Sequence, residues 1–457
     1  MNEPAPPAAN RSTAPISVVE TSSSTGPAIV TTPPSPSLPP TATVPRYAWY
    51  VLLVLALVNM VNFVDRNILA VLLEPIKLEF GLSDKQLGLL TGFAFIVVHS
   101  AFGLPLARLA DRTARRSVIA WGVAIWSAMT AAMGVATSYG QLLFLRMGVG
   151  IGEAAGAPPS HSLLSDYFPA SKRATALSLF GMGVYAGTMF GYLAAGWMGD
   201  QFGWRLTFVA VGIPGLLLAL LVGTTVREPT RPAPAADESI LFVLQYLASK
   251  PSFVFLMLAA SCHAIAAYAA IMWTPTFYQR VHGLSLQQVG FWLGPVSGVG
   301  GALGALGGGL VADRLGRRDQ RWYAWVATIV AFSAVPTGIA AYLFAGDSKS
   351  SLFAYFGFIL MIGAYNGPLH AMNQFLARPR MRSVSVAIQL FIVNLIGGVV
   401  GPWVVGAISD ALRPEVGELG IRHAMWTTVA VGASLASVFY FLTSLQLRRN
   451  IAEANEP

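Results

Sequence analysis

The stretch "LADRTARR" (residues 109–116) follows a long apolar segment, and a close copy, "VADRLGRR" (residues 311–318), follows another one in the second half of the chain. Each copy holds an aspartate, then an arginine, then a pair of arginines. A second pair of marks, "GWMGD" (196–200) and "GAISD" (406–410), ends two later apolar segments in the same order. Marks that return in the same order indicate an internal duplication, so we expect two homologous halves.

The composition excludes an ordinary soluble protein. Hydrophobic residues make up 54% of the 457 residues and charged residues 11%, whereas about 25% charged residues is usual for soluble domains. The mean hydropathy is +0.59. The sequence therefore predicts an integral membrane protein, and its single cysteine, Cys262, excludes an internal disulfide.

Twelve stretches are apolar and long enough to cross a bilayer, which takes about 20 residues in a helix. One longer polar loop, 227–252, divides them six and six. We therefore expect an all-α membrane protein with twelve transmembrane helices in two pseudo-symmetric six-helix bundles. The stretches are 47–73, 86–108, 117–137, 141–163, 174–198, 206–226, 253–278, 288–311, 322–344, 352–376, 384–408 and 424–446.

Basic residues gather on one side of the predicted membrane. The loops after the second, fourth, sixth, eighth and tenth stretches and the C-terminus carry most of them, and the opposite loops carry few. Because basic loops tend to stay in the cytoplasm, both termini are expected to be cytoplasmic. The same placement accounts for the net charge of +8 without a nucleic-acid partner.

Polar segments flank and join the predicted bundles. The N-terminal segment includes "TTPPSPSLPPTATVP", which is rich in Pro, Ser and Thr and cannot bury enough surface to fold. The predicted organisation is a disordered cytoplasmic tail (1–46), an N-terminal six-helix bundle (47–226), a cytoplasmic linker (227–252), a C-terminal six-helix bundle (253–446) and a cytoplasmic C-terminal tail (447–457).

Twelve stretches in two halves, with two basic loop motifs, resemble the major facilitator superfamily. The family's loop pattern is Gly-xxx-Asp-Arg-x-Gly-Arg-Arg/Lys. The second copy matches it from Gly309 to Arg318, whereas the first has Ala107 and Ala114 in place of the glycines. The resemblance implies alternating access around a central cavity, and a cytoplasmic gate in which the motif aspartate meets the start of a helix in the other half. The gate motif residues are Asp111, Arg112, Arg115, Arg116, Asp313, Arg314, Arg317 and Arg318.

Three further pieces resemble the Spinster-like transporters of that superfamily. They are "NFVDR" (62–66) in the first stretch, "GVGIGEAAGAPPSHSLLSDYF" (148–168) in the fourth, and "VREP" (226–229) at the end of the sixth. That family moves lysolipids and sphingoid phosphates, with proton coupling proposed. An Asn-x-x-Asp-Arg first helix also occurs in organic-anion symporters. Pro158 and Pro159 in the second piece are expected to break or kink the fourth helix.

Four charged side chains lie well inside the predicted spans: Asp65 and Arg66 in the first, and Arg146 and Glu153 in the fourth. Charges inside a bilayer are costly and mark functional sites. At about 1.5 Å per residue, Asp65 lies level with Arg146 and is predicted to pair with it, whereas Glu153 lies deeper with no cation at its own depth. We expect the two carboxylates to carry the coupling proton, and the two arginines to hold the substrate's head group or to form part of a buried charge network.

The second half has no well-buried charge, and its candidate cavity lining is polar and aromatic. A cavity that is charged on one side and apolar-aromatic on the other suits an amphiphile with an anionic head. The candidate lining residues are Asn62 from the first half and His263, Tyr268, Trp273, Tyr365, Asn366, His370 and Asn373 from the second.

The predicted function is proton-coupled secondary transport of a lysolipid or sphingoid phosphate across the plasma membrane, or the inner membrane if the source is bacterial. The expected partners are this substrate, protons and membrane lipids, and the protein is expected to be monomeric. Open alternatives are an organic-anion symporter for sugar acids, a multidrug exporter, and a channel or membrane sensor. The sequence holds no nucleophile elbow, metal-ligand spacing or phosphate loop, so no enzyme activity, metal or cofactor is expected.

Overall fold

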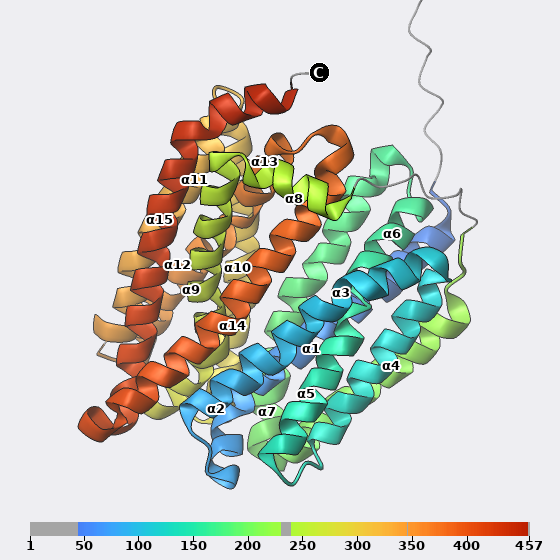
Figure 1. Ribbon diagram of the computed structural model, residues 1–457. Helices are drawn as coiled ribbons and strands as arrows, with labels where there is room; N and C mark the ends of the chain where they lie inside the picture. The colour runs from blue at the N-terminus through green and yellow to red at the C-terminus, as the bar shows by residue number, and fades with distance from the viewer. Residues whose placement is uncertain (1–43, 230–238, 345, 456–457) are drawn as a thin grey trace, which may run out of the picture. The chain divides into compact units, whose positions relative to one another are not determined.

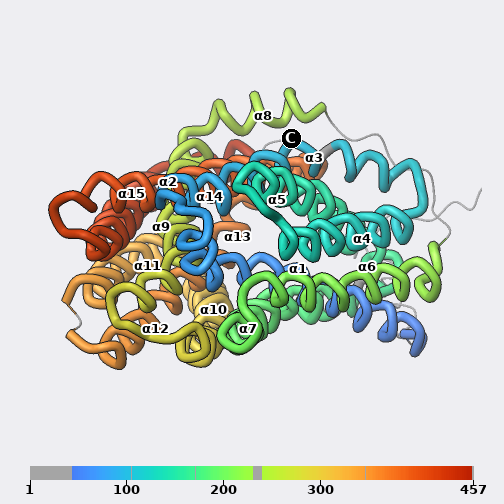
Figure 2. The backbone as a smooth tube through the Cα atoms, turned by 90° about the horizontal axis from the view of Figure 1, so that it is seen from below, coloured from blue at the N-terminus to red at the C-terminus, as the bar shows by residue number. Residues whose placement is uncertain are grey.

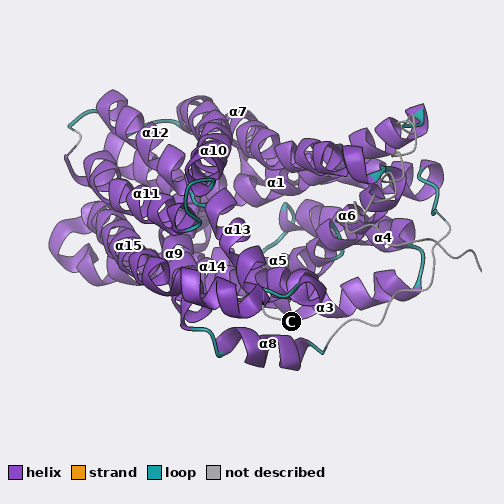
Figure 3. Ribbon diagram, turned by 90° about the horizontal axis from the view of Figure 1, so that it is seen from above, coloured by secondary structure: helices purple, strands orange, loops and turns teal. Residues whose placement is uncertain are grey.

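The computed structural model describes residues 44–229, 239–344 and 346–455. Residues from Val44 onward form one compact unit. It is built from helices, and no β-strand occurs in the described ranges (Figure 3). Most of the predicted tail, and the middle of the predicted linker at 230–238, lie outside the described residues. The prediction of an all-α fold is therefore confirmed for the described part of the chain.

The helices follow the predicted apolar stretches. In the first half they are α1 (Arg46–Phe80), α2 (Asp84–Gly88), the π-helical turn η1 (Leu89–Phe93), α3 (Ala94–Arg112), α4 (Arg115–Met133), α5 (Tyr139–Ala154), α6 (Ala157–Tyr167) and α7 (Ala170–Thr225). The linker holds α8 (Ile240–Ala248). The second half continues with α9 (Pro251–His282), α10 (Leu286–Gly316), α11 (Arg321–Ile339), η2 (Ala340–Phe344), α12 (Ser348–Ala364), α13 (Asn366–Leu376), η3 (Pro379–Met381), α14 (Arg382–Val416), η4 (Gly417–Leu419) and α15 (Gly420–Asn455).

Eight helical runs in the described residues are long and apolar enough to cross a membrane, fewer than the twelve predicted stretches. Two of the eight hold two predicted stretches each, because α7 runs on through a kink at Gly203 and α14 runs into α15. The remaining two predicted stretches lie on α4 and on the α5–α6 pair. Neither is both long and apolar enough to count among the eight runs, because α4 begins with Arg115 and Arg116 and because the α5–α6 pair is interrupted. All twelve predicted stretches are thus mostly helical.

The interruption in the fourth stretch lies where its prolines predicted it. Helix α5 ends at Ala154, and α6 begins at Ala157, followed at once by Pro158 and Pro159. Proline lacks a backbone N–H and clashes with the preceding turn, so the helix cannot run straight through. The break leaves Glu153 in the last turn of α5.

The helices form two groups that meet along two seams. Figure 1 shows α1–α7 on one side and α9–α15 on the other, and Figure 2 shows α7 beside α10 and α2 beside α14. Glycine brings the backbones together: a Cβ on Gly290 would lie 2.4 Å from the backbone oxygen of Tyr192, and one on Gly92 would lie 2.7 Å from that of Gly398. Small residues permit such close helix contacts in membranes.

The two ends of the helix assembly can be told apart by the elements that lie there. Helix α8 and the end of α15 lie at one end, and α2 lies toward the other (Figure 1). The basic-loop pattern predicts that the α8 end faces the cytoplasm. We call it the cytoplasmic end, and we call the opposite one the outer end.

Candidate functional site

The candidate site is a cluster of four charges between α1 and α5. Helix α1 carries Asp65 and Arg66, and α5 carries Arg146 and Glu153. Arg66 Nε donates to Glu153 Oε2 at 2.6 Å, and these two side chains are 20% and 0% exposed. Asp65 and Arg146 are buried and interact electrostatically with each other and with this pair. The four charged residues singled out in the sequence are thus brought together.

The predicted pairing inside this cluster is wrong. Asp65 and Arg146 form no ion pair among the described residues, and Glu153, expected to be without a cation, is held by Arg66. The prediction compared backbone depths along each helix and neglected the reach of the long arginine side chain. Asp65 instead accepts a hydrogen bond from Thr130 Oγ1 of α4, a neutral residue that nothing in the sequence pattern pointed to.

Several polar atoms of the cluster are left without a partner. Among the described residues, Asp65 Oδ1, Glu153 Oε1, and Nε and Nη1 of Arg146 are buried and make no hydrogen bond. Burying an unsatisfied polar group is costly, and most buried polar groups in proteins have partners. The cluster can therefore accept a proton on a carboxylate and can donate to an anion from Arg146.

An aromatic ring lies against both cations. The guanidinium carbon of Arg66 is 4.9 Å from the ring centre of Phe95 in α3, and that of Arg146 is 4.4 Å from it. The backbone of α5 approaches α3 closely here, since a Cβ on Gly150 would lie 2.8 Å from the backbone oxygen of Phe95. Sequence reasoning missed Phe95 because a phenylalanine in an apolar helix carries no distinguishing signal.

One predicted lining residue of the second helix group reaches the cluster. Tyr268 of α9 interacts electrostatically with Arg66 and Glu153, and its hydroxyl donates to Asn394 Oδ1 of α14 at 3.1 Å. The charged cluster of the first group therefore faces a polar contact between two helices of the second. Asn394 was not singled out from the sequence.

The other predicted lining residues are dispersed. His263 is fully buried and stacks on Tyr365 at 4.0 Å between ring centres, and the buried Trp273 donates to the Pro402 carbonyl at 2.9 Å. These three are packed inside the helix group in this conformation. The remainder are Asn62, which is buried; Asn366, which donates to Gly363 O; Asn373, which accepts from Ser385; and His370, which is exposed beside Gln389.

Two arginines of the first cytoplasmic motif bind within their own helix group. Arg115 is buried and forms ion pairs with Asp166 at 2.6 Å and Glu228 at 2.8 Å. Arg116 donates its backbone N–H to Glu228 and its side chain to the Val226 carbonyl. The motif thus joins the start of α4 to the end of α6 and to "VREP", which gives both sequence marks a structural explanation.

The second cytoplasmic motif is largely exposed. Asp313 accepts a hydrogen bond from the Tyr323 hydroxyl of α11 at 2.9 Å. Arg314, Arg317 and Arg318 are exposed, as is Arg112 of the first copy. The expected contacts of Asp111 and Asp313 with the other helix group remain predictions.

Charged residues at the outer end form a network that the sequence analysis set aside. Arg280 of α9 binds Glu74 of α1 and Asp84 of α2, each at 2.7 Å. Lys77 also binds Asp84, at 2.7 Å, and Glu418 lies 3.3 Å from Arg280. We call these five residues the outer ion cluster. It ties the first helix group to the second.

A backbone contact accompanies the outer ion cluster. Asp410, near the end of α14, accepts hydrogen bonds from the backbone N–H groups of Asp84 at 3.0 Å and Lys85 at 2.8 Å, which begin α2. Gly406 permits this approach, since a Cβ there would lie 2.3 Å from the backbone oxygen of Asp84. The mark "GAISD" was recognised in the sequence only as a sign of the internal duplication, and this contact of Asp410 was not predicted.

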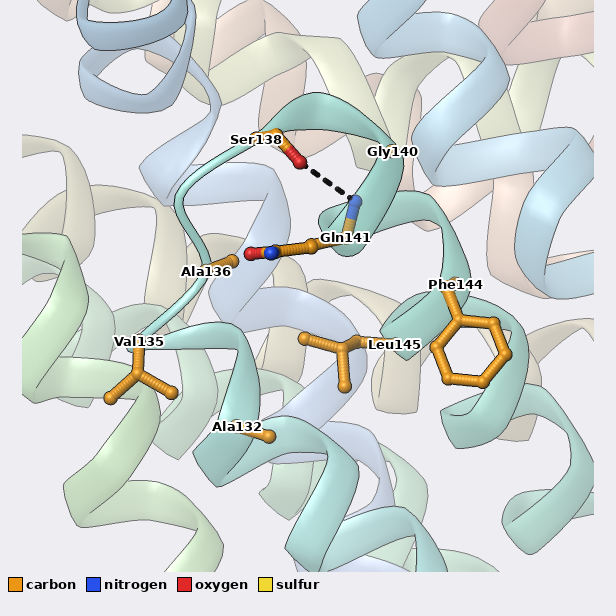
Figure 4. A pocket seen from close by; sticks show the side chains of 8 residues that line it. All are labelled: Ala132, Val135, Ala136, Ser138, Gly140, Gln141, Phe144 and Leu145. Atoms are coloured by element: carbon orange, nitrogen blue, oxygen red, sulfur yellow. Dashed lines mark hydrogen bonds between the residues drawn. The ribbon is translucent and has the colours of Figure 1, made fainter.

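Two surface pockets lie away from the four charges. One of about 580 Å³ lies near the outer end between α4 and α5 (Figure 4) and is lined by Ala132, Val135, Ala136, Ser138, Gly140, Gln141, Phe144 and Leu145. The other, of about 320 Å³, lies between α10, α11 and α12. No group of three or more metal-binding side chains occurs in the part of the chain that the structure describes.

Comparison with known proteins matches this chain to one family of transporters and to several related proteins. Residues 55–402 match the family model described as Major Facilitator Superfamily. An MFS-type efflux pump of Mycolicibacterium smegmatis is 34% identical over 90% of this chain and 95% of its own. Protein spinster homolog 1 of Xenopus tropicalis is 27% identical over 89% of this chain and 82% of its own.

A solved structure and a further relative extend this set. The crystal structure of a bacterial homolog to the human lysosomal transporter Spinster, inward-facing and unoccupied, is similar with a TM-score of 0.80 and 31% identity, covering 89% of this chain and 98% of that one. The probable galactarate/D-glucarate transporter GudP of Bacillus subtilis is 25% identical over 60% of this chain and 66% of its own.

Proposed function

We propose that this chain, which belongs to the major facilitator superfamily and is a multi-pass membrane transporter, couples protons to the movement of an anionic amphiphile by alternating access. The observation that carries the proposal is the buried cluster of Asp65, Arg66, Arg146 and Glu153. Its unsatisfied carboxylate oxygens and its unpaired guanidinium lie in the same helix group. We further propose twelve spanning helices with both termini in the cytoplasm.

Charge balance supports the coupling. The cluster holds two carboxylates and two guanidiniums, so an incoming anion leaves one uncompensated negative charge in a medium where such a charge is costly. A proton on Asp65 or Glu153 removes that excess. Substrate and proton then bind more favourably together than apart, which is the differential interaction that a coupled cycle requires.

The roles within the cluster follow from the contacts. Arg146 has no carboxylate partner and offers Nε and Nη1 to the head group. Asp65 Oδ1 is a free position for the proton. Glu153 is held by Arg66, and protonation of Glu153 would weaken that ion pair and free Arg66 for the substrate.

The polar contacts between the two helix groups at the outer end support alternating access. Polar contacts join the two helix groups at the outer end through Arg280 and Asp410. The solved relative that this chain resembles is described as inward-facing. We take this structure as open toward the cytoplasm, with the outer contacts separating when the cytoplasmic end closes.

The likeness to Spinster proteins supports a lipid-like substrate with an anionic head, because the arginines suit such a head. Two other substrate classes have their own support. The relative named an efflux pump favours drug export, and GudP favours a small sugar acid.

Transport by purified protein in proteoliposomes tests the proposal. Uptake of a lysophosphatidic acid and of D-glucarate is measured with and without an imposed pH gradient, against empty liposomes. Gradient-dependent movement of the lysolipid is the expected result. Gradient-dependent movement of the sugar acid alone assigns the chain to the organic-anion class, and movement that ignores the gradient contradicts proton coupling.

A further inference from the structure

The ring of Phe95 is the one aromatic face in the described residues that lies against both cations of the charged cluster. Its centre is 4.9 Å from the guanidinium carbon of Arg66 and 4.4 Å from that of Arg146. Phe95 is itself 3% exposed and Arg146 is 1% exposed, so the contact between them is shielded from water. A cation over an aromatic face is attracted by the negative centre of the ring, and more strongly when both are desolvated.

Arg146 depends on this ring more than Arg66 does. Arg66 has Glu153 as a counter-ion at 2.6 Å. Arg146 forms no ion pair among the described residues, and its Nε and Nη1 make no hydrogen bond. Asp65, the carboxylate of the cluster that has no ion-pair partner among the described residues, also has an unpartnered oxygen. Arg146 and Asp65 therefore lie in one cluster, each with unsatisfied atoms, without forming an ion pair. The contact that Arg146 makes instead is with the ring of Phe95.

The position of the ring is built into the helix packing. Gly150 in α5 faces the backbone of Phe95 so closely that a Cβ would lie 2.8 Å from the Phe95 oxygen and 3.4 Å from the His99 nitrogen. Phe95 is the second residue of α3, which begins directly after the π-helical turn η1. The extra residue of a π-helical turn changes which side chains of the following helix face a neighbour. Turns of this type often occur at functional sites.

We propose that Phe95 is a positioning residue that holds Arg146 away from Asp65, so that Arg146 stays available to an anionic head group and Asp65 stays available to a proton. This rests on the proposed function. With the ring face weakened, Arg146 turns to Asp65 and neutralises it. The groups that act on Asp65 or Arg146 in this arrangement are Arg66 of α1, His99 of α3, Thr130 of α4 and Glu153 of α5. Tyr268 of α9 acts on Arg66 and Glu153.

Fluorinated phenylalanines test this most sharply. Phe95 is replaced with mono-, di- and trifluorophenylalanine by nonsense suppression. Each fluorine withdraws electron density from the face of the ring and nearly keeps the size of the ring. Binding of a lysophosphatidic acid is expected to weaken stepwise, by about 5- to 30-fold for the trifluoro ring. The same series at Phe93, which is 46% exposed on the preceding turn, is the matched control and should change nothing.

A substrate-free measurement separates this inference from the proposed function. Infrared difference spectra follow the protonated carboxyl band of Asp65, assigned by its loss in Asp65→Asn. The pH midpoint of that band is expected to fall with each fluorine, by up to about one pH unit, because a nearby cation keeps Asp65 charged to lower pH.

Each outcome decides one point. If wild type fails to bind the lysolipid but the midpoint follows fluorination, the substrate class is wrong and the role of Phe95 holds. If the midpoint ignores fluorination, the role of Phe95 is overturned whatever the protein transports. Phe95→Leu should behave as the trifluoro ring and Phe95→Tyr as wild type. Should Phe95→Leu not fold, the fluorinated series, which keeps the ring, still decides.

Discussion

Asp410 of α14 accepts the first two backbone N–H groups of α2, from Asp84 at 3.0 Å and Lys85 at 2.8 Å. The residues are far apart in sequence and belong to different helix groups. A carboxylate at a helix start is favoured by the helix dipole. The superfamily resemblance led us to expect such a contact at the cytoplasmic end for Asp111, and the structure has an equivalent one at the outer end.

Removing this charge should loosen the outer end. Asp410→Asn keeps the size of the side chain and loses about 0.3–2 kcal/mol of charge–dipole attraction. The population open to the outside should rise by about 2- to 30-fold. Pulsed electron spin distances between labels at Gly140 and Lys349, in a Cys262→Ser background, report the separation of the two groups there.

Asp200 offers a matched control for that experiment. It ends "GWMGD", the counterpart of "GAISD", and is exposed. Among the described residues its hydrogen bond is to the neighbouring Gln201. Asp200→Asn should leave the distances unchanged, and an equal shift in both variants would remove the special role given to Asp410.

Arg280 should be the strongest single contact of the outer ion cluster. Its Nε donates to Glu74 and its two Nη nitrogens donate to Asp84, and the side chain is nearly buried. Among the described residues, Arg280→Gln leaves Glu74 without a cation and Asp84 with Lys77 alone, a loss of about 3–5 kcal/mol where the pair is desolvated. The same spin labels should report an open outer end. Arg413→Gln, at a half-exposed pair with Glu418, should have little effect; outer distances that stay closed in Arg280→Gln would count against the cluster as a gate.

Arg115 should act on stability and leave coupling alone. Its ion pairs with Asp166 and Glu228 join α4, α6 and the segment after α7 within one helix group. Arg115→Lys cannot hold both carboxylates in the same way and should lower the free energy of unfolding by about 1.5–3 kcal/mol.

Thermal denaturation in detergent measures this loss, with Arg112→Lys as the exposed control from the same motif. The pH dependence of transport by the folded Arg115→Lys protein should match wild type. A changed pH dependence would mean that this motif takes part in coupling.

The sequence was enough to find the helices and the charged cluster, because both depend on composition. Apolar stretches of spanning length located nearly every helix, and four charges in an apolar background marked the site. The sequence did not show which side chains pair with one another within the site. Arg66 reaches Glu153 through a long side chain whose direction the sequence does not specify.

Neutral neighbours were also beyond sequence reasoning. Thr130 and Phe95 contact the charged cluster, yet each belongs to a residue type that is common in apolar helices. The outer ion cluster was missed for the opposite reason. Glu74, Asp84 and Arg280 lie near helix ends, where charges are ordinary and only their convergence in space makes them distinctive.

The central claim is that the charged cluster couples protons to transport, and one measurement tests it most directly. Proteoliposomes holding wild type, Asp65→Asn or Glu153→Gln are loaded or bathed with a lysophosphatidic acid, and accumulation driven by an imposed pH gradient is compared with exchange without a gradient. We predict that each substitution abolishes gradient-driven accumulation while at least one of them retains exchange, because binding at Arg146 does not require both carboxylates. Full gradient-driven accumulation in both variants would show that neither carboxylate carries the coupling proton and would contradict the account.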